Sequence, residues 1–102
     1  MERNKKIKDI ANHYGVSHQS NKAIEEMAEL TQALCKISDA PACDPKVPSL
    51  LDSVIDEIAD VCVLMEQMKL FYGPKEVEDR IDFKIDRQIE RICMGLERGG
   101  MI

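Results

Sequence analysis

The sequence has few aromatic residues and few residues that break helices. Among 102 residues there are two tyrosines, two phenylalanines and no tryptophan, with only five glycines and four prolines. Aliphatic residues and methionine dominate the hydrophobic set instead, and this composition favours helices over sheets. We therefore expect an all-α protein, and the length corresponds to one domain over residues 1–102.

The sequence also lacks a long hydrophobic run and a paired cysteine motif. The longest purely apolar run, residues 61–65, is too short to span a membrane, and residues 1–10 lack an apolar signal core. The four cysteines form no CxxC pair, which argues against a zinc site or a disulfide framework. These absences predict a cytoplasmic protein with no membrane partner.

Positive charge is in deficit, because 14 lysines and arginines face 19 aspartates and glutamates, for a net charge of -5. An excess of negative charge argues against binding duplex nucleic acid by bulk electrostatics. An acidic protein can still bind a polyphosphate when metal ions stand between the like charges. The charge therefore excludes one class of partner and leaves polyphosphates open.

Hydrophobic residues at helical spacing predict two helices in the first part of the chain. The first is expected over residues 2–14 and closes at Gly15, a residue that favours helix ends. Ser17 or Ser20 is expected to cap the second helix, which continues to about residue 37.

Two further helices are predicted after a loop over residues 38–48, which contain three prolines. The third is expected to start from a cap at Ser49 and to end at Gly73. The fourth is expected to have Pro74 in its first turn and to end at Gly99–Gly100. Four amphipathic helices with short connections predict a four-helix-bundle-like fold, within one chain or completed by oligomerisation.

A seven-residue acidic pattern occurs in both the second and the third predicted helix. Residues 24–30 read IEEMAEL and residues 55–61 read IDEIADV, at an offset of 31 residues, and every position matches in type. We call these segments the first and the second cassette. A helical hairpin closed by the proline-rich loop would bring the two cassettes face to face.

Each cassette carries two carboxylates three residues apart, Glu26 with Glu29 and Glu57 with Asp60. On a helix this spacing places both on one face, one turn apart. The simplest alternative is a solvated acidic face. Against it, neither Glu57 nor Asp60 has a lysine or arginine three or four residues away, and both share their stripe with Leu64. A carboxylate on a core-facing stripe is costly without a compensating partner, whereas Glu26 and Glu29 are expected closer to the polar edge of their helix.

A hard divalent cation is the partner that four carboxylates favour. Carboxylate oxygens select magnesium or manganese over zinc. A di-iron bundle would need a Glu-x-x-His pattern, and neither His13 nor His18 has a glutamate three residues before it. The sequence therefore predicts a Mg²⁺ site in which Mn²⁺ can substitute. Its expected ligands are Glu26, Glu29, Glu57 and Asp60.

The predicted fourth helix carries a basic stripe, formed by Arg80, Lys84, Arg87 and Arg91 at spacings of four, three and four residues. Taken alone, the stripe is accounted for by a solvated face with salt bridges. Beside an acidic metal site, the same cations would neutralise the outer oxygens of a polyphosphate.

The acidic pattern, Glu25-Glu26-x-x-Glu29 followed by Glu57-x-x-Asp60, resembles that of the MazG-like, all-α nucleoside triphosphate pyrophosphatases. The segments NKAIEEMAELTQALCK and DEIADVCVLMEQMKLFYG are similar to those of the short, single-domain MazG-like proteins of phages and Gram-positive bacteria. The resemblance covers residues 19–91, most of the chain. It implies that the protein hydrolyses a nucleoside triphosphate to a monophosphate and pyrophosphate with Mg²⁺, as a homodimer or homotetramer.

The resemblance also implies roles for individual residues. Glu26 and Glu57 match metal-binding catalytic positions of the family, and Glu25 would act from the outer shell or orient water. The residues expected to contact the substrate are Lys84, Arg87, Arg91, Lys22 and Gln19.

Two alternatives stay open from the sequence. One is a non-enzymatic helical module for protein association, with the acids on a solvated or partner-binding face. The other keeps the chemistry and changes the substrate, because phosphoribosyl-ATP pyrophosphohydrolase has a similar helical core. The few aromatic residues leave the base of the substrate undetermined.

Overall fold

The computed structural model describes residues 1–95, and over this range the chain is all-α, as the sequence predicts, with no strand. The four helices are α1 (Arg3–Tyr14), α2 (Val16–Asp39), α3 (Val47–Tyr72) and α4 (Pro74–Cys93). None of these helices combines the length and the hydrophobicity that crossing a membrane requires.

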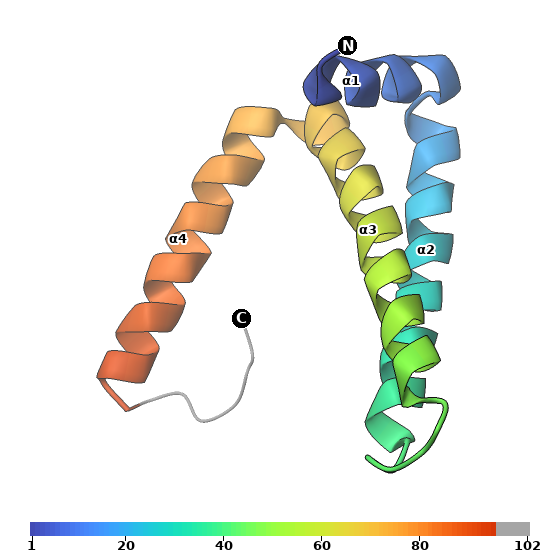
Figure 1. The fold of residues 1–102 in the computed structure, drawn as a ribbon. Helices are drawn as coiled ribbons and strands as arrows, with labels where there is room; N and C mark the ends of the chain where they lie inside the picture. The colour runs from blue at the N-terminus through green and yellow to red at the C-terminus, as the bar shows by residue number, and fades with distance from the viewer. Residues whose placement is uncertain (96–102) are drawn as a thin grey trace. The chain divides into compact units, whose positions relative to one another are not determined.

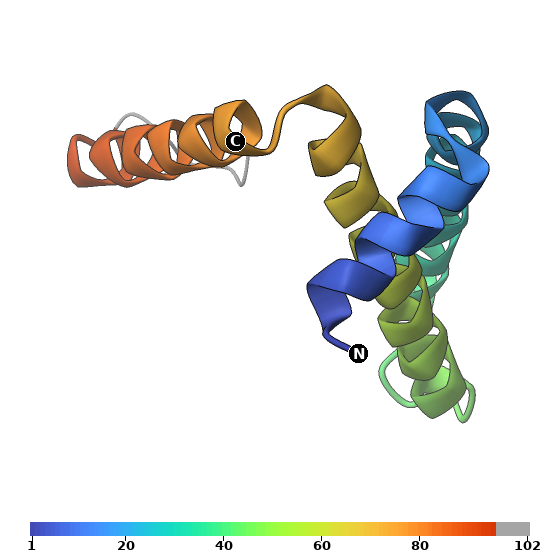
Figure 2. The ribbon, with the colours of Figure 1, turned by 90° about the horizontal axis from the view of Figure 1, so that it is seen from above.

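The chain divides into two compact units, Met1–Phe71 and Tyr72–Ile102. The first unit contains α1, α2 and α3, and the second contains α4. Within the first unit, α2 and α3 run side by side in opposite directions (Figure 1). Helix α1 crosses the end of this pair where α2 begins and α3 ends (Figure 2). The three helices thus form a bundle-like arrangement, while one domain over residues 1–102 stays a prediction.

A glycine makes the sharp turn between α1 and α2. Gly15 has φ of 86°, a conformation that glycine adopts without a steric penalty, and its N–H donates to the carbonyl oxygen of Ala11 at 2.9 Å. The predicted end of α1 is therefore confirmed. The predicted serine caps are wrong, because α2 begins at Val16 directly after the turn and has no side-chain cap, so that Ser17 and Ser20 lie inside the helix.

The loop between α2 and α3 is shorter than the sequence predicts. Helix α2 continues to Asp39, and α3 already begins at Val47. Ser49 therefore lies inside α3 and is not its cap; its hydroxyl donates to the carbonyl oxygen of Lys46 at 2.9 Å. Pro48 fits in the first turn of a helix, where its missing N–H would have no partner in any case.

Helix α4 begins as predicted and ends earlier. Gly73, with φ of 123°, separates it from α3, and Pro74 occupies its first turn. The helix ends at Cys93, before Gly95, which has φ of 70°. The predicted end at Gly99–Gly100 lies outside the described residues.

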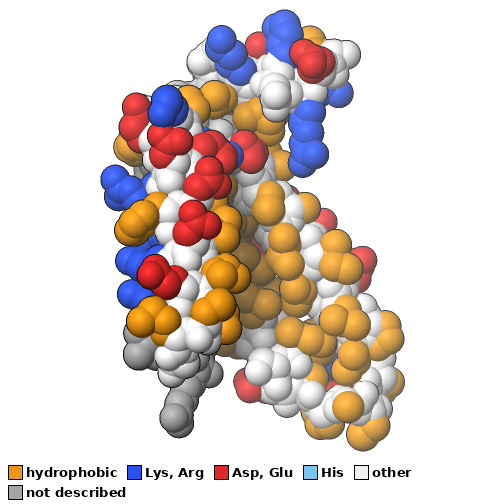
Figure 3. Space-filling view, turned by 90° about the vertical axis from the view of Figure 1, so that its left-hand side faces the viewer, with side chains coloured by type: hydrophobic (Ala, Val, Ile, Leu, Met, Phe, Trp, Pro, Cys, Tyr) orange, Lys and Arg blue, Asp and Glu red, His pale blue; other side chains and the backbone are white. Residues whose placement is uncertain are grey.

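The first unit has a small interior in which polar side chains are prominent. The buried hydrophobic residues are Ala11, Ala23 and Leu64, and the buried polar residues are Gln19, Glu26 and Gln67. Large hydrophobic side chains remain exposed on the unit, including Ile24 on α2 and Ile55 on α3, at 62% and 65%. Hydrophobic side chains are also prominent on the face of the molecule in Figure 3.

Candidate functional site

The antiparallel packing of α2 and α3 brings the two cassettes together. Glu26 of the first cassette and Glu57 and Asp60 of the second each offer one carboxylate oxygen, and these three oxygens lie within 4.8 Å of one another. Glu26 is buried, Glu57 is half-buried and Asp60 is exposed. We call these three residues the acidic triad.

Burial within the triad differs from the expectation. Glu26 was predicted near the polar edge of its helix, yet it is only 7% exposed and is the most buried of the predicted ligands. The reason is the packing of α3 against this side of α2, which amphipathicity within a single helix does not specify.

Two oxygens of the triad are buried without compensation. Glu26 Oε2 and Glu57 Oε2 are both shielded from solvent and have no hydrogen-bond partner. Buried polar atoms nearly always have a partner, and a buried unpaired carboxylate oxygen is costly. A positive charge or a hydrogen-bond donor placed between the two helices would therefore stabilise these two oxygens.

Lys22 supplies part of that positive charge. Its Nζ lies 3.3 Å from Glu26 Oε1 and 3.5 Å from Glu25 Oε2. The hydrogen bond to Glu26, together with the two negative charges, raises the pKa of Lys22. Sequence reasoning placed Lys22 near the substrate and missed this ion pair, although the spacing of four residues before Glu26 indicates it.

The second cassette has no such counter-charge. The position equivalent to Lys22, 31 residues later, is Ser53, whose hydroxyl donates to the carbonyl oxygen of Ser49 at 3.1 Å. Within the described residues, no lysine or arginine lies at ion-pair distance from Glu57 or Asp60, so the second cassette is left without a cation of its own.

The crowding of carboxylates opposes their ionisation. Burial, reinforced by the negative charges of its neighbours, raises the pKa of Glu57. Partial desolvation of its carboxylate, together with the negative charge of Glu26, raises the pKa of Asp60, although the residue as a whole is exposed. A cation bound between these groups would reverse both effects, because it favours the ionised form.

Glu29, the fourth predicted ligand, lies outside the triad but interacts with it. The neighbouring carboxylate of Glu26 is the main cause of a raised pKa at Glu29. Together with Glu57 it lines a hollow between α2 and α3. The remaining lining residues of this hollow are Gln32, Ala33, Lys36, Leu50 and Ser53.

The residues present fit a hard divalent cation. Every candidate donor atom of the triad is a carboxylate oxygen, which suits Mg²⁺ or Mn²⁺ better than Zn²⁺. The two unpartnered oxygens are the atoms that would gain most from such an ion. Acidic groups of this kind also occur without a metal, so the ion itself stays a prediction.

Gln19, which was predicted to contact the substrate, lies buried in the first unit. Its side chain is 4% exposed and therefore offers almost no surface to a nucleotide. Its Nε2 donates to Oε1 of Gln67 at 2.8 Å, and Gln67 Nε2 donates to the carbonyl oxygen of Val63 at 3.2 Å. Sequence reasoning missed Gln67, although a polar residue three positions after Leu64 on the buried stripe of α3 indicates a hydrogen-bonded site.

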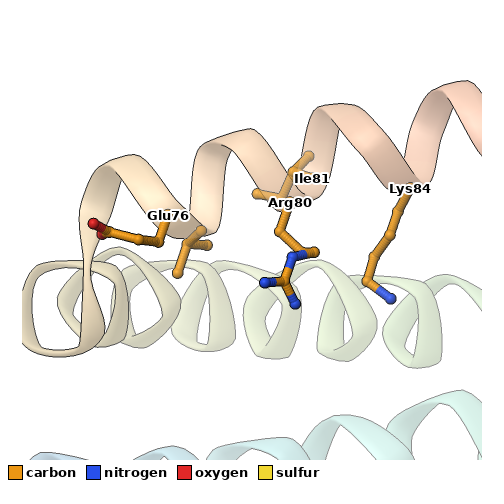
Figure 4. Close-up of a pocket in the computed structure, with 5 residues that line it drawn as sticks. Glu76, Arg80, Ile81 and Lys84 are labelled. Atoms are coloured by element: carbon orange, nitrogen blue, oxygen red, sulfur yellow. The ribbon is translucent and has the colours of Figure 1, made fainter.

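The predicted phosphate-binding cations lie on α4, in the second unit. Arg80 and Lys84 extend from one side of this helix and line a hollow with Ile81 (Figure 4). The guanidinium of Arg87 lies over the ring of Phe83, 5.8 Å from its centroid. Roles in substrate binding for Lys84, Arg87 and Arg91 stay predictions.

Comparisons of the chain with protein-family models, with curated proteins and with solved structures found no match. The resemblance to MazG-like proteins therefore depends on the acidic pattern and its surrounding segments alone.

Proposed function

We propose that this chain is a magnesium-dependent nucleoside triphosphate pyrophosphohydrolase. It would convert a ribo- or deoxyribonucleoside triphosphate and water into a monophosphate and pyrophosphate. The observation that carries the proposal is the pair of buried, unpartnered oxygens, Glu26 Oε2 and Glu57 Oε2, contributed by two helices to one acidic triad. A solvated acidic face would leave such oxygens in water.

The acids of both cassettes would hold the cation. Glu26, Glu57 and Asp60 already bring three oxygens together, and Glu29 interacts electrostatically with this group through the carboxylate of Glu26. Bound Mg²⁺ would supply Lewis-acid stabilisation of the negative charge on the phosphate oxygens.

Two charged residues at the edge of the triad, Lys22 and Glu25, are suited to contact the phosphate and to position the attacking water. Lys22 is exposed on one side and lies 3.3 Å from Glu26, so its ammonium group can turn from the carboxylate to a phosphate oxygen. Glu25 is exposed and lies 3.5 Å from the same lysine. Its carboxylate is suited to orient the attacking water or to accept its proton.

The basic stripe of α4 would neutralise the outer phosphates. Lys84, Arg87 and Arg91 lie along one side of the helix at spacings of three and four residues. This part of the proposal is supported by the charge pattern and by the resemblance to MazG-like proteins.

Self-association is part of the proposal, as a homodimer or homotetramer. Large hydrophobic side chains such as Ile24 and Ile55 are more than half exposed, and apolar surface that gathers into a patch marks an interaction site. A second copy of the chain is the partner that would cover it. Light scattering coupled to size-exclusion chromatography should therefore give a mass of two or four chains, and a single-chain mass would contradict this part.

The test of the activity is a panel of nucleoside triphosphates incubated with the protein and Mg²⁺ and followed by ³¹P NMR. Formation of monophosphate and pyrophosphate is expected, and formation of diphosphate and orthophosphate would overturn the proposal. Phosphoribosyl-ATP belongs in the same panel, because its hydrolysis identifies the alternative substrate. Asp52→Asn is the matched control, since Asp52 is an exposed acid of α3 outside the triad.

The exposed hydrophobic surface also favours the second candidate function, a non-enzymatic association module. Such a module has no use for the buried oxygens of the triad. Protein that associates, hydrolyses no member of the panel and is not stabilised by Mg²⁺ would support the module and contradict the enzyme.

A further inference from the structure

A stacked pair of aromatic rings lies at the surface where α1 meets α2. The rings of Tyr14 and His18 have centroids 4.8 Å apart and an interplanar angle of 16°. Both residues are exposed, and Tyr14 keeps 51% of its surface accessible. In a chain with so few aromatic residues, a ring pair left in water contributes little to the core and is available to a planar ligand.

Buried amides fix the imidazole of this pair. His18 Nδ1 lies 2.7 Å from Oε1 of Gln19, and Gln19 Nε2 donates to Gln67 Oε1 at 2.8 Å. Because the amide nitrogen of Gln19 is turned toward Gln67, its oxygen faces His18 and requires a hydrogen on Nδ1. The orientation of the imidazole is held through Gln19 and Gln67, two side chains that are almost fully buried.

A hollow beside the imidazole shares a lining residue, Lys22, with the surroundings of the acidic triad. His18, Asn21, Lys22 and Glu25 line this hollow on α2. Lys22 links it to the triad through its contact with Glu26. Eight residues separate His18 from Glu26 along the helix, or about 12 Å at the rise of an α-helix, which is the scale of a nucleotide from its base to its phosphates.

We propose that Tyr14, His18 and Asn21 form the nucleobase subsite of the acidic triad. The base would stack on the exposed ring surface, and the Asn21 amide would offer a donor and an acceptor to its edge. Lys22 would lie between the base and the carboxylates, near the first phosphate. The assignment rests on the proposed function, because it takes the triad as the phosphate end of the substrate.

The first test measures binding without turnover. Nucleoside 5′-monophosphates are titrated into the protein while the imidazole and amide signals are followed by NMR, and inorganic pyrophosphate is titrated in parallel. Saturable shifts of His18 and Asn21 are expected with the nucleotides. Replacing His18→Ala should weaken nucleotide binding about tenfold, the scale of one lost stacking contact, and leave pyrophosphate binding unchanged. Equal losses for both ligands, or no loss, would overturn the subsite.

Two variants control for folding. His13→Ala removes the other imidazole of the chain, which meets Tyr14 edge-on and does not line the hollow, and should bind nucleotides like the unmodified protein. If His18→Ala does not fold, Asn21→Ala is the second variant, because Asn21 lies at an exposed position of the helix. It should weaken the binding of nucleotides and leave the binding of pyrophosphate unchanged.

The kinetics separate a failure of the subsite from a failure of the function. In His18→Ala, KM for the triphosphate should rise about tenfold with little change in kcat, because the lost contact binds substrate and transition state alike. Hydrolysis with an unchanged KM would overturn the subsite and leave the function standing. Base binding without hydrolysis would overturn the function and leave the subsite standing.

Discussion

The two cassettes have nearly the same seven residues and different electrostatic surroundings. In the first, Lys22 reaches both Glu25 and Glu26. In the second, the equivalent residue is Ser53, and within residues 1–95 no cation pairs with Glu57. The first cassette is therefore partly neutralised by the chain itself. In the proposed enzyme the second cassette would depend on a cation from outside, which makes it the half whose behaviour reports most clearly on a metal.

The largest expected effect is on activity, and it differs between the cassettes. Glu57→Gln keeps the size of the side chain and removes the charge that no lysine compensates. We expect kcat/KM for hydrolysis of the best triphosphate to fall by on the order of a hundredfold or more. Glu25→Gln, at the exposed edge of the first cassette, should cost less, because solvent can partly replace an exposed side chain that orients the attacking water. Equal losses of kcat/KM in Glu57→Gln and Glu25→Gln, measured in a steady-state assay, would contradict this difference between the two cassettes.

The next effect is stabilisation by metal. Mg²⁺ at about a hundred times its Kd should raise Tm by on the order of 10 °C in a protein of this size, because the ion binds only the folded triad. Differential scanning fluorimetry with Mg²⁺ and with a chelator measures the shift. Glu57→Gln should lose most of the rise, whereas Asp52→Asn should retain it; a rise that survives in Glu57→Gln would place the ion elsewhere.

Exchanging the counter-charge tests the comparison itself. Ser53→Lys gives the second cassette the lysine that the first one has, so the metal-free protein should become more stable by a few degrees and bind Mg²⁺ more weakly. Lys22→Met should do the opposite. The shifts are small because exposed ion pairs contribute little. Melting curves of both variants, recorded with and without Mg²⁺, measure these changes in Tm. Changes of the same sign in Ser53→Lys and Lys22→Met would contradict the role of Lys22 as the counter-charge of the first cassette.

The smallest effect is on the pH dependence of stability without metal. The pKa values of Glu29, Glu57 and Asp60 are raised in the folded protein. Their contribution to stability is fully present below their unfolded values, 3.8 for aspartate and 4.5 for glutamate, and is lost as the pH rises through the folded values. Metal-free Glu57→Gln should therefore melt a few degrees above the unmodified protein at pH 7, and this difference should vanish below about pH 4. A lower Tm for Glu57→Gln than for the unmodified protein at pH 7 would contradict the inference that repulsion among these carboxylates destabilises the metal-free fold.

Features determined by neighbouring residues could be predicted from the sequence. Gly15 and the Gly73–Pro74 pair fix helix ends through their own backbone preferences, and these ends are confirmed. The acids of the cassettes meet because a hairpin with a short loop leaves few other arrangements for two matched helices.

Features determined by contact between helices could not be predicted. The burial of Glu26 depends on how α3 packs against α2, and the hydrogen bond between Gln19 and Gln67 joins residues 48 positions apart. The serine caps at Ser17 and Ser49 were wrong because each helix starts earlier than its strongest local signal.

Binding of Mn²⁺ to the metal-free protein, followed by electron paramagnetic resonance, tests the central claim most directly, since Mn²⁺ takes the same oxygen ligands as Mg²⁺. The account predicts saturable binding that Mg²⁺ displaces and that Glu57→Gln abolishes, with Asp52→Asn unaffected. Absence of saturable binding, or equal binding by Glu57→Gln and the unmodified protein, would contradict a metal site at the acidic triad.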